Sequence, residues 1–87
     1  MNGDRYTLDT NILLYAVDRD AGDKHEQAVE LVKKSVTADC ILILQSLSEF
    51  FHAATRKGKM PLEDAHGQVR DWMTLFPVQA ASAHTLD

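Results

Sequence analysis

Several kinds of residue are scarce in this sequence, and each scarcity excludes a class of protein. The single cysteine, Cys40, rules out an internal disulfide. Because it opens an apolar run, we expect a buried free thiol and a reducing, cytoplasmic compartment. No apolar stretch is long enough to span a membrane, and the N-terminal segment lacks the basic start and apolar core of a signal peptide. The remaining composition, 45% hydrophobic and 25% charged over 87 residues, is typical of one globular domain or part of one.

Positive charge is also scarce. Nine Lys and Arg residues against 13 Asp and Glu residues give a net charge of −4, which argues against a broad basic surface for nucleic acid. A nuclease is not excluded, because a metal site needs clustered acids. Arg56, Lys57 and Lys59 form the only compact basic cluster of the sequence. It fits either the cationic end of a helix or a contact with phosphate groups.

Three segments have the pattern of β-strands. Residues 5–8 form a short candidate strand that leads into Asp9. Residues 40–44 are continuously apolar, which is typical of a strand buried on both faces. Residues 77–79 are the third candidate.

Helical patterns fill the segments between these strands. A helix is expected over 12–17, after three residues that favour N-caps. Four more helices are expected. Two begin at capping boxes, Asp23 with Glu26 and Ser46 with Glu49, and the other two begin at Pro61 and at Ser82. Apolar residues at helical spacing predict the buried faces, and these are Ala28, Leu31, Val32, Val36, Leu47, Phe50, Phe51, Ala54, Leu62, Ala65, Val69, Trp72, Met73 and Phe76. This order indicates an α/β fold with a parallel sheet and right-handed crossovers across residues 1–87.

Two acids, Asp9 and Glu49, are predicted at one edge of the sheet. Asp9 ends the first strand, and Glu49 lies in the first turn of the helix predicted after the second strand. Open parallel sheets bind ligands outside the carboxyl ends of their strands, so neighbouring strands would bring both carboxylates to one crevice. Carboxylates about 4 Å apart repel by roughly 4 kcal/mol near a protein surface, and a hard cation offsets this. Oxygen ligands select Mg²⁺ or Mn²⁺, with Thr10 and Asn11 as supporting groups that bind the metal's waters.

Each acid also has a purely structural interpretation, and the local sequence leaves both interpretations open. Asp9 can cap the helix that begins near Asn11, and Glu49 can complete the capping box with Ser46. Glu49 and His52 form a Glu-x-x-His pair, but a di-iron site needs further ligands and a helical bundle. The other histidines occupy predicted helices without ligand spacing, so we expect them to face solvent; they are His25, His66 and His84.

Two motifs resemble those of a known family. Residues 8–15, LDTNILLY, closely resemble the opening motif of PIN domains, in which an acid ends the first strand and is followed by a small hydroxyl residue and Asn. Residues 46–51, SLSEFF, resemble the second motif, whose Glu is the second acid. The resemblance covers the whole chain but only the N-terminal part of the family's domain. It implies a parallel-sheet α/β/α sandwich of the PIN type whose C-terminal part is absent here.

The resemblance also implies a function. PIN domains of this group are Mg²⁺- or Mn²⁺-dependent ribonucleases, and many are VapC-type toxins that form homodimers and are silenced by a VapB-type antitoxin protein. Asp9 and Glu49 would be the catalytic metal ligands, and RNA the substrate. The family's third acid lies well beyond the second, and Asp87 comes too early to take that role. We therefore expect activity in the complete protein, and weak metal binding with no cleavage from these 87 residues alone.

Two alternatives remain. Phosphohydrolases of the haloacid dehalogenase type place a second Asp two residues after a nucleophilic Asp, but this position is Asn11 here. The other alternative is a non-catalytic, truncated PIN module that binds a protein or RNA.

Overall fold

A computed structural model describes residues 6–56 and 60–80 of the chain. Its sheet has three short parallel strands in the order β1-β2-β3, with β2 in the middle. The strands are β1 (Tyr6–Thr7), β2 (Cys40–Ile43) and β3 (Val78–Gln79). The predicted α/β fold with a parallel sheet is therefore confirmed, and all three strands fall within the predicted segments.

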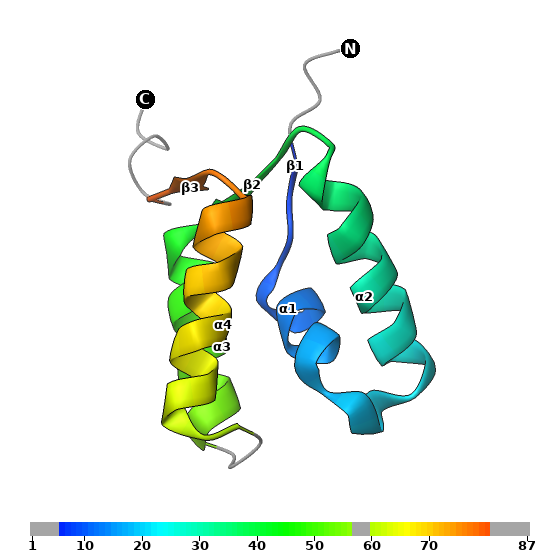
Figure 1. Cartoon of the computed structure of the whole chain (residues 1–87), viewed down its shortest axis with the longest axis vertical. Helices are drawn as coiled ribbons and strands as arrows, with labels where there is room; N and C mark the ends of the chain where they lie inside the picture. Colours follow the sequence, from blue (N-terminus) through cyan, green and yellow to red (C-terminus); the bar gives the residue numbers. More distant parts are fainter. Residues whose placement is uncertain (1–5, 57–59, 81–87) are drawn as a thin grey trace.

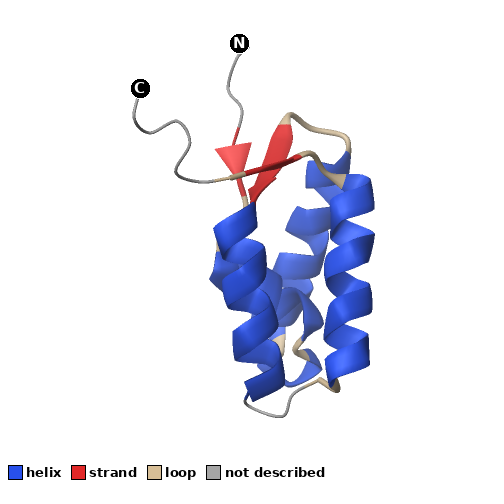
Figure 2. Cartoon of the chain, turned by 90° about the vertical axis from the view of Figure 1, so that its left-hand side faces the viewer, coloured by secondary structure: helices blue, strands red, loops and turns tan. Residues whose placement is uncertain are grey.

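Helices account for most of the described chain. In Figure 1, α3 and α4 lie on one side of β1 and α2 lies on the other, with α1 below the end of β1 between them. Figure 2 shows that the strands gather at one end of the helices. The helical elements are α1 (Thr10–Val17), the 3-10 turn η1 (Arg19–Ala21), α2 (Asp23–Val36), α3 (Leu44–Arg56) and α4 (Leu62–Leu75). No helix among the described residues is both long and apolar enough to cross a membrane.

The core lies where the helices meet β2. Phe50 of α3 is fully buried, and its ring contacts Trp72 of α4 edge-on at a centroid distance of 4.9 Å. Cys40 is a buried free thiol, as predicted, and burial raises its pKa above the ordinary value. The residues of the main cluster come from every layer of the fold, and they are Leu8, Leu13, Cys40, Leu42, Leu47, Phe50, Ala54, Trp72 and Phe76.

Part of the predicted core is wrong. Four residues expected on buried helix faces are exposed, namely Leu31, Val36, Leu62 and Met73. Helical spacing gives the direction of the apolar face but not the extent of the surface that covers it.

Both predicted capping boxes are wrong as well. Gly22, not Asp23, precedes α2; its φ of 64° is a left-handed conformation that glycine adopts without strain. No side chain caps that helix. Helix α3 begins at Leu44, so Ser46 lies inside it rather than at its start. Pro61 precedes α4 by one residue, and the helix expected after Ser82 lies outside the described residues.

Candidate functional site

Asp9 follows β1 and caps α1, as its structural interpretation required. Its Oδ1 accepts a hydrogen bond from the backbone N–H of Ile12 at 3.0 Å. The side chain is nevertheless exposed, and its second oxygen makes no hydrogen bond to the described residues. A capping carboxylate of this kind keeps one oxygen available for another ligand.

Glu49 does not act as a helix cap. Because α3 begins at Leu44, Glu49 is the sixth residue of the helix, beyond the reach of the free N–H groups of the first turn. Its carboxylate is bound by side chains instead. Oε1 accepts a hydrogen bond from Thr10 Oγ1 at 3.0 Å, and Oε2 accepts one from Gln45 Nε2 at 3.4 Å. The strongest structural explanation for this acid is thereby removed.

The fold explains why these residues meet. β1 and β2 are neighbouring parallel strands, with Thr7 opposite Ile41, so their carboxyl ends lie at the same edge of the sheet. The chain passes from β1 into α1 after two residues and from β2 into α3 without a loop. The Thr10–Glu49 bond then joins residues that are 39 positions apart. The edge predicted from the sequence thus brings the residue next to Asp9 into contact with Glu49.

The other predicted site residues take no visible part in this contact. Asn11 is exposed in the first turn of α1, and its supporting role stays a prediction. Arg56 is exposed at the last position of α3, whereas Lys57 and Lys59 lie outside the described residues.

The structure describes three of the four histidines, and they differ in exposure. His52 is exposed, and its ring lies 6.1 Å from that of Phe51. His66 is exposed as expected, but His25 is half-buried, with Nδ1 2.9 Å from the carbonyl oxygen of Tyr15, so its expected exposure is wrong. His84 lies outside the described residues.

The donor atoms at this edge suit a hard cation. They are the carboxylate oxygens of Asp9 and Glu49, with the hydroxyl of Thr10 and the amide of Gln45 beside them. Mg²⁺ is commonly bound by one or two carboxylates and keeps several waters, so this set fits. In the part of the chain that the structure describes, no group of three or more His, Cys, Asp or Glu residues is placed to hold a metal. Among the described residues, Asp9 and Glu49 are thus the acids that this edge offers to a cation.

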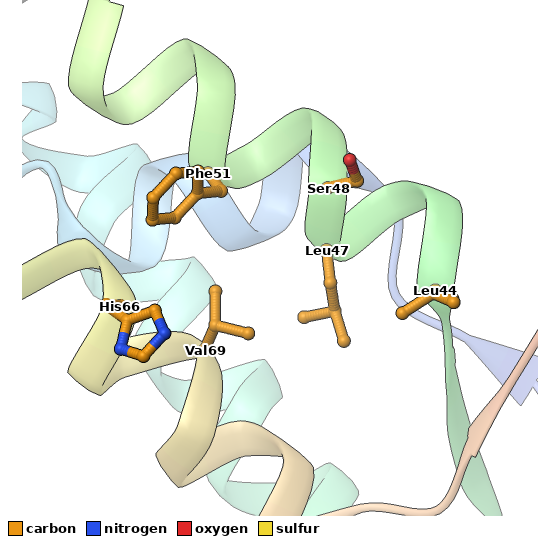
Figure 3. Close-up of a pocket in the computed structure, with 6 residues that line it drawn as sticks. All are labelled: Leu44, Leu47, Ser48, Phe51, His66 and Val69. Atoms are coloured by element: carbon orange, nitrogen blue, oxygen red, sulfur yellow. The ribbon is translucent and has the colours of Figure 1, made fainter. Parts of the chain in front are cut away.

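A hollow of about 260 Å³ lies elsewhere on α3, in the groove between α3 and α4. Figure 3 shows Leu47 and Phe51 of α3 pointing toward His66 and Val69 of α4 across it. Its lining has no carboxylate: the residues are Leu44, Leu47, Ser48, Phe51, His66 and Val69. The two acids and this hollow are therefore at different places on the described part of the chain.

Comparison with protein-family models, curated proteins and solved structures found no match. The function therefore has to be inferred from the residues of the chain itself.

Proposed function

We propose that this chain is the N-terminal part of a PIN-type domain, and that the complete protein is a Mg²⁺- or Mn²⁺-dependent endoribonuclease. In this proposal the protein is the toxin of a type II toxin–antitoxin pair. The observation that carries the proposal is the hydrogen bond between Thr10 and Glu49. It joins the two motifs, LDTN and SLSE, that resemble those of PIN domains, at the sheet edge where such enzymes hold their acids.

Each residue of the site has a role in the proposed reaction. Asp9 and Glu49 hold the cation through their carboxylates, and Thr10 fixes the orientation of Glu49. Asp9 binds the cation with the carboxylate oxygen that does not cap α1. The bound cation would orient the scissile phosphate, lower the pKa of a water and neutralise developing charge. Arg56, Lys57 and Lys59 are the proposed phosphate contacts.

The proposed partners follow from the same resemblance. They are an RNA substrate, a VapB-type antitoxin and a second copy of the complete protein.

Cleavage of RNA by the complete protein tests this proposal. A fluorescently labelled single-stranded RNA is incubated with the purified protein and Mn²⁺, with a parallel sample in EDTA. We expect cleavage that needs Mn²⁺ and is lost in Asp9→Asn, a substitution that retains a good N-cap. Glu30→Gln, which neutralises an exposed acid within α2, is the matched control and should cleave normally.

The alternative function is a non-catalytic module that binds RNA or protein. The observation that favours it is that no third acid joins Asp9 and Glu49 among the described residues. RNA binding without cleavage, equal in the wild type and in Asp9→Asn, would select this alternative.

A further inference from the structure

Gln45 is a member of the site that the sequence motifs do not single out. It lies in the first turn of α3, one helical turn before Glu49, and its side chain is exposed. Its Nε2 donates to Glu49 Oε2 at 3.4 Å, while Thr10 Oγ1 donates to Oε1 at 3.0 Å. The two oxygens of one carboxylate are thus held by donors from two different helices.

Two donors on opposite oxygens restrict how the carboxylate can rotate. A glutamate on an exposed helix surface otherwise samples several rotamers, and binding a cation then costs the entropy of ordering it. Groups that hydrogen-bond a metal ligand reduce this cost by orienting it in advance. Gln45 supplies that bond from within α3, independently of the contact between α1 and α3.

The neutral amide is suited to this position. A lysine or arginine would also donate to Glu49, but its charge would repel a cation bound beside it. An aspartate or glutamate could not donate when ionised. Glutamine combines a hydrogen-bond donor with zero net charge, and its length spans the distance to a residue four positions along the helix.

We propose that Gln45 is a positioning residue of the cation site, which orients Glu49 for binding Mg²⁺ or Mn²⁺. This inference rests on the proposed function, because it assumes that Glu49 is a metal ligand. It assigns Gln45 no contact with the substrate or with the reacting atoms.

The test measures the Mn²⁺ dissociation constant of the complete protein by calorimetry. Gln45→Met keeps an unbranched side chain of similar length and removes the donor; Gln27→Met, an exposed glutamine on α2, is the matched control. We expect Gln45→Met to weaken binding by about tenfold or more, as for other groups that support metal ligands, and Gln27→Met to leave it unchanged. Circular dichroism verifies that both variants are folded.

A second readout separates positioning from a general effect on the helix. In NMR spectra of the wild type, added Mg²⁺ should shift the side-chain amide signals of Gln45 and leave those of Gln27 in place. Unchanged Mn²⁺ affinity in Gln45→Met, with binding lost in Glu49→Gln, would overturn the role of Gln45 alone. Absence of Mn²⁺ binding in the wild type would overturn the proposed function and this inference together.

Discussion

Consecutive residues of α3 face different neighbours: Ser48 lines the groove shared with α4, and Glu49 contacts Thr10 of α1. The groove side is mostly apolar, and Leu47, which lines the groove, also belongs to the buried core. The Glu49 side is polar and exposed, and it is ordered by hydrogen bonds between side chains. One helix thus separates an apolar surface from a polar surface that carries Glu49. Substitutions on the two sides should therefore change different measured quantities.

The largest expected effect is on RNA cleavage. Glu49→Gln and Leu44→Gln both place glutamine at an exposed position of α3, one on each side. We expect Glu49→Gln to reduce Mn²⁺-dependent cleavage by the complete protein to the level seen in EDTA, because the proposed metal ligand loses its charge. Leu44→Gln should cleave as the wild type does. Equal activity in the two variants would remove the functional difference between the two sides.

The next largest effect is on stability. Phe50 is fully buried against Trp72, whereas Phe51 is half-buried in the groove wall. Phe50→Ala should lower the free energy of unfolding by about 3–5 kcal/mol, from lost burial and a residual cavity. Phe51→Ala should cost clearly less, because part of its side chain is already exposed in the folded protein. Urea denaturation of both variants measures the difference, and equal losses would show that the groove is as tightly packed as the core.

A smaller effect is expected at Thr10. Thr10→Val removes the hydroxyl that binds Glu49 Oε1 while preserving the shape of the side chain. Mn²⁺ affinity should fall by about tenfold, and Thr10→Ser, which retains the hydroxyl, should restore most of it. If the valine and serine variants bind Mn²⁺ equally well, the contact between α1 and α3 does not orient Glu49.

The smallest effect concerns pH. Burial raises the pKa of the Cys40 thiol in the folded protein above its value in the unfolded chain. The folded state therefore favours the neutral thiol, and this contribution to stability is complete below the unfolded pKa and declines as pH rises through the folded pKa. The stability difference between wild type and Cys40→Ala should shrink as the pH is raised above about 8.5, the ordinary thiol pKa. A difference that stays constant up to pH 10 would contradict a raised pKa.

The sequence predicted secondary structure best where a run of residues fits only one kind of element. The continuous apolar run after Asp39 predicted the buried central strand, and the N-cap residues after β1 predicted α1. Helix starts were less predictable. Ser46 and Glu49 have the spacing of a capping box, but β2 runs directly into α3 at Leu44, an apolar residue that fits a strand or a helix equally well.

The candidate site was predictable only in part. Asp9 and Glu49 could be assigned to one sheet edge from strand order, but the Thr10–Glu49 contact depends on how α1 packs against α3, which no local pattern specifies. Gln45 was missed although a signal was present, because residues four apart on a helix are neighbours and Gln45 precedes Glu49 by four.

The central claim is that the end of β1 and the first half of α3 form one oxygen-rich cation site. It is tested most directly by anomalous diffraction from a crystal of the complete protein soaked in Mn²⁺. We predict an anomalous peak bound, directly or through one water, by the carboxylates of both Asp9 and Glu49. A peak that involves only one of them, or no peak near either, would contradict the claim.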